Sequence, residues 1–351
     1  MTRRIRIFQV DAFTTDRFTG NPAGVVLDAD SLNDAEMLAI ARELNNADTA
    51  FVLKPDGADH DLRVRFFTPR TEASFVGHAT VATHFVLSRE TVKPGRVRQR
   101  QKSGLVDVEV RGEGITRRIA VRQPAPPLGR QLNDRERLAV LDALALSTGD
   151  IDTRCPLRIV GGAGTRLLIG VRSTEQLKQL KPDYSRLTTL SAQLGAAGFF
   201  VFTLAHGQAG CLTESRMFCP ALGIPEDPVS GNAHGLLGAY LAEQGLLQHN
   251  GATAQFTGAQ GHHVHRSGRV DVELEFRDGK LDGVWIVGQA VEIFETSMTL
   301  SASEWCREGI PGIRRESRES LPGTACSSEA RTSRGRLPRS PNAVANPRCR
   351  E

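Results

Sequence analysis

The stretch that decides the fold is Pro225-Glu226-Asp227-Pro228-Val229-Ser230-Gly231-Asn232-Ala233-His234, a turn of small residues that opens a helix. Pro228 and Gly231 interrupt the backbone, and apolar residues with helical spacing follow them. The start of such a helix leaves several backbone N–H groups without partners, and these groups bind carboxylates or phosphates. Asp227 lies just before the helix, where a carboxylate can take or give a proton.

The first half of the chain contains an echo of this stretch. Arg-x-Phe-x-Pro at 65–69 is followed by Gly-x-Ala at 77–79, and the same motifs occur in the same order at 216–220 and 231–233. A duplicated unit explains this order better than chance does. We therefore expect two similar lobes, each with a helix opened by Gly-x-Ala, and both helices aimed at one cleft.

Length and charge limit the classes of function. The chain has 351 residues, enough for one large or two medium domains, and a net charge of +4. Residues 301–351 hold ten of the 44 basic and six of the 40 acidic residues, so the body of the protein is neutral. Nucleic-acid binding requires clustered Lys and Arg, so we expect no nucleic-acid partner for this body.

The cysteines and the N-terminus indicate a reducing, aqueous environment. Six Cys occur at irregular positions without a CxxC pair, which argues against a zinc ribbon or a disulfide framework. We find neither a signal-peptide pattern nor an apolar run long enough to span a membrane. The sequence therefore predicts a cytoplasmic protein without a membrane partner.

Strand patterns dominate the chain, which favours an α+β fold over a doubly wound parallel sheet. An extended, proline-rich linker is expected at 123–127, and a single strand at 284–294. The main helices are expected at 34–44, from 77 onward, and at 134–146, 173–180, 184–194 and 231–243.

These patterns divide the chain into three parts. We expect an N-terminal lobe of residues 1–123 that is completed by about 288–300, and a C-terminal lobe of residues 124–287. Residues 301–351 are rich in Arg and Ser and poor in large apolar residues, which predicts a disordered tail. A nucleic-acid-binding arm is the alternative interpretation of this tail.

Two further motifs are interpreted as structural. The glycine cluster at 161–164 is not GxGxxG and precedes a strand, which argues against dinucleotide binding. The histidines at 262–265 have no carboxylate or Cys at ligand spacing, so we expect no metal site there.

Five separated motifs are similar to those of the PhzF-like isomerases of phenazine biosynthesis, and they occur in the order found in that family. The motifs are Phe8-Gln9-Val10-Asp11-Ala12-Phe13, Gly20-Asn21-Pro22-Ala23-Gly24, Phe67-Thr68-Pro69, Gly77-His78-Ala79-Thr80 and Glu226-Asp227-Pro228-Val229-Ser230-Gly231. The resemblance covers roughly residues 5–298. It implies the fold of diaminopimelate epimerase, with two pseudo-symmetric lobes, each a curled mixed or antiparallel sheet around a central helix.

The resemblance also implies an activity. Members of this family are cofactor-free isomerases, commonly homodimers, that act on a small-molecule substrate. Their characterised reaction isomerises trans-2,3-dihydro-3-hydroxyanthranilate by moving a proton. We therefore expect an isomerase without a cofactor whose active site lies between the lobes.

The family pattern assigns catalytic roles to Asp48, His78 and Asp227. Asp48 removes a proton and returns it at another position, for which its pKa must be raised by burial or by another carboxylate. His78 donates to a substrate oxygen or orients a carboxylate. Asp227 holds His78, binds a substrate amine or relays the second proton. Without the resemblance, a chain-reversal cap, a structural histidine and an N-cap-like residue are the simpler interpretations of these three.

The remaining site residues come from the two helix starts. Backbone N–H groups there are expected to bind a substrate carboxylate at the positive ends of both helices. The expected substrate-binding residues are Gly77, Ala79, Ser230, Gly231 and Asn232.

Two departures from related patterns matter. The usual catalytic segment, Asn-x-Ser-Glu-Thr, has Ala47 and Asp48 in place of Ser and Glu. The Asp carboxylate is one methylene shorter, and a misplacement of about 1 Å costs ~100-fold in rate. Racemases of this fold carry a Cys before each helix-opening Gly, where this chain has Val76 and Ser230, so a thiol-based racemase is disfavoured.

Three hypotheses follow. The first is an isomerase of a small carboxylate-bearing metabolite with Asp48 as acid and base. The second is an epimerase or racemase that uses Asp48 and Asp227 as opposed bases. The third is a catalytically silent metabolite-binding protein that kept the fold while losing the Glu.

Overall fold

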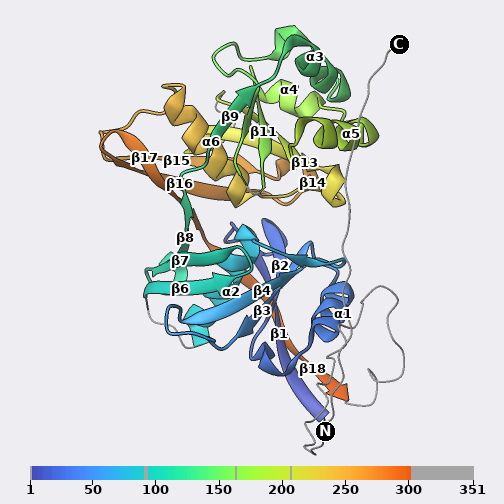
Figure 1. Cartoon of the computed structure of the whole chain (residues 1–351), viewed down its shortest axis with the longest axis vertical. Coiled ribbons are helices and arrows are strands. Elements are labelled where there is room, and N and C mark those ends of the chain that lie inside the picture. Colours follow the sequence, from blue (N-terminus) through green and yellow to red (C-terminus); the bar gives the residue numbers. More distant parts are fainter. Residues whose placement is uncertain (1, 91–93, 163, 206–207, 302–351) are drawn as a thin grey trace, which may run out of the picture. The chain divides into compact units, whose positions relative to one another are not determined.

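In the computed structural model, backbone hydrogen bonds connect the 18 strands of the described residues into one continuous network (Figure 1). The structure describes residues 2–90, 94–162, 164–205 and 208–301. The predicted tail, 301–351, lies outside the described residues except for its first residue.

The first half builds a mixed sheet around helix α2 (Gly77–Glu90). In it, β2 runs parallel to β3, β4 runs parallel to β6, and the other neighbours are antiparallel. Helix α1 (Asp34–Leu44) connects β2 to β3. The strands of this half are β1 (Thr2–Ala12), β2 (Asn21–Val26), β3 (Asp48–Leu53), β4 (Leu62–Phe67), β5 (Glu72–Ala73), β6 (Gly95–Gln101), β7 (Gly104–Arg111) and β8 (Arg118–Pro124).

The second half repeats this order around helix α6 (Gly231–Glu243). Again β11 runs parallel to β12, and β13 runs parallel to β15. The remaining helices are α3 (Asp134–Ala143), α4 (Thr174–Gln179) and α5 (Tyr184–Leu194). The strands are β9 (Leu128–Gln131), β10 (Arg158–Val160), β11 (Arg166–Val171), β12 (Gly198–Thr203), β13 (Thr213–Cys219), β14 (Ile224–Asp227), β15 (Thr253–Gln260), β16 (Gly268–Arg277), β17 (Lys280–Gly288) and β18 (Ala290–Ser301).

Two pairings join the halves. Strand β17 pairs with β8, and the last strand, β18, returns to pair with β1 along its whole length. The assignment of residues 288–300 to the first lobe, and the other domain limits, stay predictions, although β18 lies beside β1 as they require (Figure 1).

The Arg-x-Phe-x-Pro repeat has the same structure in both halves. Arg65 and Arg216 each lie over the phenylalanine two residues further on, at 5.1 and 5.0 Å from the ring centroid. Each arginine also pairs with a glutamate on the short strand that follows, Glu72 at 2.8 Å and Glu226 at 2.7 Å. Sequence, strand order and side-chain contacts therefore agree on a duplicated unit.

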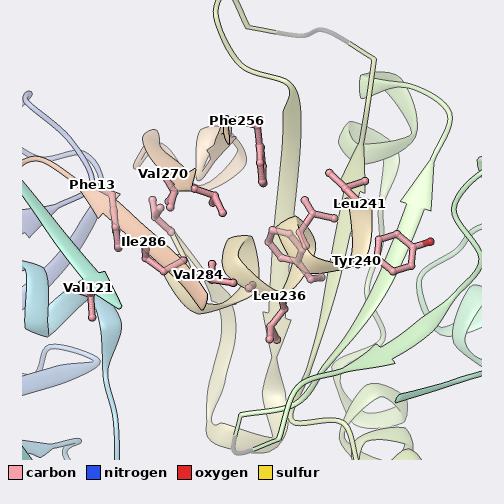
Figure 2. Packing of buried hydrophobic residues seen from close by; sticks show 14 of the residues in the cluster. Phe13, Val121, Leu236, Tyr240, Leu241, Phe256, Val270, Val284 and Ile286 are labelled. Atoms are coloured by element: carbon pink, nitrogen blue, oxygen red, sulfur yellow. The ribbon is translucent and has the colours of Figure 1, made fainter. Parts of the chain in front are cut away.

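Helix α6, which begins within the stretch 225–234, is buried on nearly all sides. Figure 2 shows Tyr240 on the side of α6 away from Val270 and Ile286; its ring packs edge-on against Phe202 of β12, with the ring centroids 6.2 Å apart. Gly235 permits the close approach of α6 to β17, since a Cβ there would lie 2.7 Å from the Ile286 Cδ1 atom. Burying such apolar side chains contributes roughly 1.5–3 kcal/mol each.

Two expectations about strands were wrong in detail. The predicted single strand at 284–294 is two strands, β17 and β18, separated at Gln289, whose carbonyl accepts from the amide of Phe13. The chain changes partner there, from β8 and β16 to β1, which local alternation does not reveal. The expected linker at 123–127 is shorter, because Gln123 and Pro124 still pair with β17.

The two Arg–Glu pairs give a test of the fold. Arg216 and Glu226 have side chains only 10% and 9% exposed, whereas Arg65 and Glu72 are 26% and 21% exposed. Arg216→Ala leaves Glu226 buried and unpaired, so we expect a loss of about 3–5 kcal/mol in the free energy of unfolding. Arg65→Ala is expected to cost about 1 kcal/mol. Urea unfolding of both variants checks this, and equal losses contradict it.

Candidate active site

Three side chains predicted as catalytic lie together. Asp48 is the first residue of β3, His78 lies in the first turn of α2, and Asp227 ends β14. The Asp48 Oδ2 atom is 3.8 Å from the His78 Nε2 atom, and the two side chains are 12% and 10% exposed. Asp227 is close enough for its charge to raise the pKa of Asp48. The structure brings the three residues into one place, and their catalytic roles stay predictions.

Asp48 is not needed to cap the chain reversal before β3. Asn45 ends α1 in the left-handed region with a φ of 51°, a conformation that Asn tolerates. The amide of Asn46 exchanges two hydrogen bonds with the amide of Gln9, at 2.8 and 3.1 Å. Among the described residues, the Asp48 carboxyl accepts no hydrogen bond, so the capping interpretation has no support.

Burial changes the ionisation of Asp48. Removal from water disfavours the charged form, and the negative charge of Asp227 adds to this, so the pKa of Asp48 rises to about 8. Asp48 is therefore mostly protonated at neutral pH. A carboxyl group that titrates near the working pH is suited to both giving and taking a proton.

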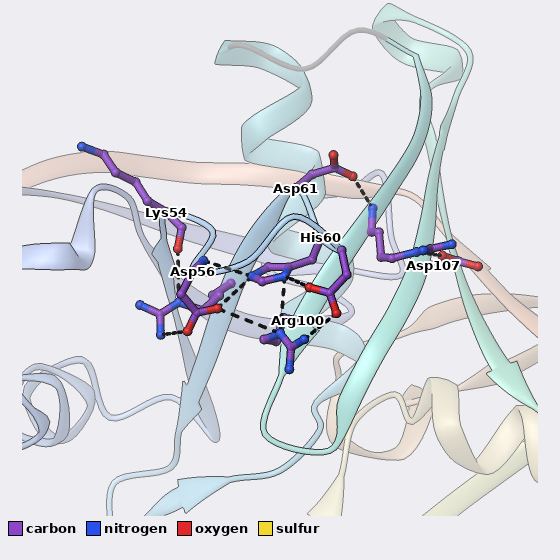
Figure 3. Close-up of polar contacts among 9 residues, drawn as sticks. Lys54, Asp56, His60, Asp61, Arg100 and Asp107 are labelled. Atoms are coloured by element: carbon purple, nitrogen blue, oxygen red, sulfur yellow. Dashed lines mark hydrogen bonds and ion pairs between the residues drawn. The ribbon is translucent and has the colours of Figure 1, made fainter.

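His78 is buried and differs from His60 in its hydrogen bonding. Burial lowers the pKa of His78 to about 4, so the ring is neutral, and its Nε2 atom has no hydrogen-bond partner. By contrast, His60 is held on both sides, with Nδ1 2.7 Å from Asp59 and Nε2 3.0 Å from Asp56 (Figure 3). A buried nitrogen without a partner is costly, so the free Nε2 of His78 marks a place for a ligand atom.

Asp227 is held by Asn21 from the other half of the chain. The Asn21 Nδ2 atom donates to Oδ1 of Asp227 and to the carbonyl of Val229, both at 2.8 Å. The structure corrects two interpretations of Asp227. It does not hold His78, and it is not the cap of α6, because Ser230 occupies the N-cap position and accepts from the amide of Ala233.

Desolvation also raises the pKa of Asp227, although its side chain is partly exposed. The Arg166 charge and hydrogen bonds from Asn21 and Ser230 oppose this rise. Two carboxyl groups with raised pKa values thus share one site, an arrangement typical of acid–base catalysis.

The helix starts present free backbone donors, as expected. The amide of Thr80 is the first in α2 with an intrahelical acceptor, and Gly77, His78 and Ala79 precede it. In α6 the corresponding first amide is that of His234, after Gly231 and Asn232. The binding role of these residues stays a prediction, and the amide of Ser230 is not free, because it donates to Gln260 Oε1 at 3.1 Å. The side chain of Ala79 is fully buried, and Gly231 has no room for one, since a Cβ would lie 2.7 Å from the Phe13 ring.

A family model described as "Phenazine biosynthesis-like protein", PhzC-PhzF, matches residues 10–296. The chain belongs to the PhzC-PhzF family. The matched residues agree with the range of the resemblance.

Relatives in this family are named as isomerases. The uncharacterized isomerase YddE of Salmonella typhimurium is 41% identical over 84% of this chain and 99% of its own length. The trans-2,3-dihydro-3-hydroxyanthranilate isomerase of Pseudomonas chlororaphis is 31% identical over 80% of this chain and 95% of its own. The expectation of an isomerase is thereby confirmed at the level of enzyme class.

Solved structures confirm the fold. The PhzF-family phenazine biosynthesis protein of Bacillus anthracis matches with a TM-score of 0.76 and 28% identity, over 84% of this chain and 99% of that one. A hydroxyproline epimerase of Agrobacterium vitis, 12% identical, matches with a TM-score of 0.54 over 85% and 93% of the two chains, which bears on the fold alone. The expected α+β fold with two similar lobes is confirmed.

Sequence reasoning missed three residues of this PhzC-PhzF site. Asn21 belongs to a recognised motif, and its position there was the available signal. The Gln260 amide donates from Nε2 to the carbonyl of Asp227 at 2.7 Å and accepts from the amide of Ser230 at 3.1 Å, which fixes the turn before α6. The third missed residue is Arg166. No local sequence pattern indicates a site role for Gln260 or Arg166.

Two cavities lie near the site. One, of about 370 Å³, begins one residue before Asp48 and is lined from both halves, by residues 45–47, 68–70 and 222–224. The other, of about 460 Å³, includes Phe13, Arg118 and Arg269 in its lining. Asp48, His78 and Asp227 line neither of these two cavities.

Two further observations concern metal binding and membrane-spanning helices. Among the described residues, we find no group of three His, Cys, Asp or Glu side chains placed to hold a metal ion. Of the histidines at 262–265, His263 lies 3.7 Å from Glu214. Within the same part of the chain, no helix has the length and apolar character needed to cross a membrane.

The raised pKa of Asp48 predicts a pH-dependent stability. It is about 8 in the folded protein and about 4 in an unfolded chain, so the folded state binds this proton more tightly. The contribution of Asp48 to the free energy of unfolding therefore falls as pH rises from about 4 to about 8. Asp48→Asn mimics the protonated carboxyl and does not titrate. Its Tm should gain several degrees relative to the native protein between pH 5 and pH 8 in calorimetry.

Asp278→Asn is the matched control, because Asp278 lies in the exposed turn between β16 and β17 at a positive φ that Asn also adopts. A Tm difference for Asp48→Asn that does not change with pH contradicts the prediction.

Proposed function

We propose that this protein is a cofactor-independent isomerase that moves a proton between two carbons of a small carboxylate-bearing metabolite. One observation carries the proposal. A buried carboxyl group, Asp48, titrates near neutral pH and lies 3.8 Å from a neutral histidine, His78, whose nearer nitrogen has no partner.

The proposed reaction needs no external electron acceptor or donor. The ionised form of Asp48 takes a proton from one carbon, and the electron pair left behind shifts along the conjugated system. Protonated Asp48 then returns the proton to another carbon, so the atoms and charges of substrate and product balance. Neutral His78 polarises a substrate oxygen without adding a charge that would hold Asp48 ionised.

The helix starts supply the binding energy for an anionic group. Free amides at Gly77–Ala79 open the helix that carries His78, and those at Gly231–Asn232 follow Asp227 in the chain, so the positive ends of α2 and α6 favour a carboxylate there. These interactions orient the substrate, so that the reacting carbon lies near Asp48.

The relatives narrow the substrate class. The Pseudomonas chlororaphis relative is named for trans-2,3-dihydro-3-hydroxyanthranilate, and the matching family is described through phenazine biosynthesis. We propose a substrate of this type, a small amino- or hydroxy-substituted carboxylate, for a cytoplasmic homodimer.

A second candidate is an epimerase that uses two carboxylates. It is favoured by the charge of Asp227 acting on Asp48, which places two titrating carboxyls in one site. Inversion of one stereocentre, with no movement of a double bond, distinguishes this reaction from the first.

Proton exchange tests the proposal directly. With trans-2,3-dihydro-3-hydroxyanthranilate in deuterated water, one C–H position should exchange under NMR observation. Asp48→Asn removes the group that carries the proton, so we expect a loss of about 10²–10⁴-fold in rate. Asp278→Asn serves again as the matched control and should exchange at the native rate.

Binding without exchange in the native protein contradicts the proposal and favours a silent metabolite-binding protein. Asp48→Glu then separates the causes, because it restores the carboxylate length usual in the family. A gain of exchange in this variant shows that only the reach of Asp48 was lacking.

The pH profile gives an independent check. A base acts only when ionised, so a pKa of about 8 for Asp48 predicts that kcat/KM rises with pH to a plateau, with its midpoint near pH 8. Asp227→Asn removes the neighbouring negative charge and should move this midpoint to lower pH. A midpoint near pH 4 in the native enzyme is inconsistent with Asp48 as the buried base.

A further inference from the structure

Arg166, the first residue of β11, lies beside the start of α6. Its Nη1 atom donates to the carbonyls of Gly164 at 2.8 Å and Thr165 at 3.2 Å. The Nδ2 atom of Asn232 donates to the same Gly164 carbonyl at 3.2 Å. The Gly164 carbonyl thus accepts from both Arg166 and Asn232, and it holds the guanidinium next to Asn232 in the first turn of α6.

The guanidinium of Arg166 has unused donors. Among the described residues, it forms no ion pair, and its buried Nε atom has no hydrogen-bond partner. Its two hydrogen bonds use only Nη1, which leaves Nε and Nη2 on one edge. These two donors bind a carboxylate with two parallel hydrogen bonds, a geometry that Arg supplies and Lys does not.

A buried donor without a partner, such as the Nε atom of Arg166, lowers the stability of the protein. Buried polar groups are normally paired, and an unsatisfied buried donor loses the hydrogen bonds that water would give it. Asp227 is near enough for Arg166 to oppose the rise in its pKa, yet no ion pair forms between them. The arrangement is therefore that of a cation held in place for a negative group that is not part of the chain.

The internal repeat places Arg166 at the position equivalent to Ala23, the residue beside Asp48. In the first half, β2 pairs with β3 so that Ala23 lies beside Asp48. In the second half, the equivalent pair of β11 and β12 sets Arg166 beside Gly198. The duplicated unit thus carries an acid on one strand in the first half and a cation on the paired strand in the second half. Asp227 interacts with both, since its charge raises the pKa of Asp48 and the charge of Arg166 opposes the rise in the pKa of Asp227.

We propose that Arg166 binds the carboxylate of the substrate edge-on through Nε and Nη2, together with Asn232 and the amides at the start of α6. Arg166 is then a specificity-determining residue that selects an anionic substrate over its neutral analogue. This inference rests on the proposed function, because it takes the site around Asp48 to be the substrate site.

A binding experiment with a carboxylate and its neutral counterpart tests the inference. Anthranilate and anthranilamide have the same ring and amino group and differ only in the charge of one substituent. Calorimetric titration of the full chain at pH 7 should show tighter binding of anthranilate. In Arg166→Gln this affinity should fall by about 10- to 100-fold, while anthranilamide binding stays the same.

Arg269→Gln is the matched control. Arg269 is exposed, forms no ion pair within the described residues, and lines the 460 Å³ cavity rather than the start of α6. This variant should keep the native preference for anthranilate. A loss in Arg269→Gln instead of Arg166→Gln overturns the inference and places the anion in that cavity.

Equal affinity of the native protein for the two probes, or an unchanged preference in Arg166→Gln, also overturns it. If Arg166→Gln lowers the Tm, Arg166→Lys decides, because it keeps the charge but loses the paired donors and should still weaken anthranilate binding. The readout is binding, so a failure of proton exchange would remove the proposed function and leave this result standing.

Discussion

The site depends on one repeated interaction, the pairing of a strand arginine with a glutamate that follows the next turn. Arg216 ties β13 to β14 through Glu226, and β14 ends at Asp227. Arg65 ties β4 to β5 through Glu72, and the chain then enters α2 with His78 in its first turn. In both halves the pair fixes the short strand from which a site residue is delivered. The pair in the second half is nearly dry, so its hydrogen bonds are strong and its geometry is tightly defined.

Three buried polar atoms in or beside the site have no hydrogen-bond partner. Asn21 Oδ1, Thr49 Oγ1 and His78 Nε2 are buried without partners, and each belongs to a residue in or beside the catalytic group. Asn21 bonds Asp227, Thr49 follows Asp48, and His78 lies against Asp48. Buried atoms without partners also occur elsewhere among the described residues, for example His84 Nδ1 and Ser191 Oγ, so it is their position beside Asp48 and Asp227 that associates these three with a ligand.

The sequence was sufficient for features that are encoded locally. Helices α1 and α5 and the start of α2 have the predicted bounds, because helical spacing and a Gly-opened turn are properties of short segments. The motifs also led to Asp48, His78 and Asp227 before any geometry was known. The features that the sequence did not predict depend on contacts between residues far apart in the chain. The change of partner at Gln289 and the turn held by Gln260 depend on strands that are distant in sequence, and no local pattern reports them. Arg166 was missed for the same reason, since nothing around it distinguishes a free guanidinium from a surface one.

The pairing of β18 with β1 has a consequence for biosynthesis. The register runs from Thr2 opposite Ser301 to Ala12 opposite Ala290, so the first described strand has its neighbour in the last described strand. Until nearly 300 residues have been synthesised, one edge of β1 exposes unpaired backbone groups. Contacts this distant along the chain slow folding, and the exposed edge invites association with other nascent chains. Completion of the sheet of the first half therefore waits for β18, which acts as its closing strand.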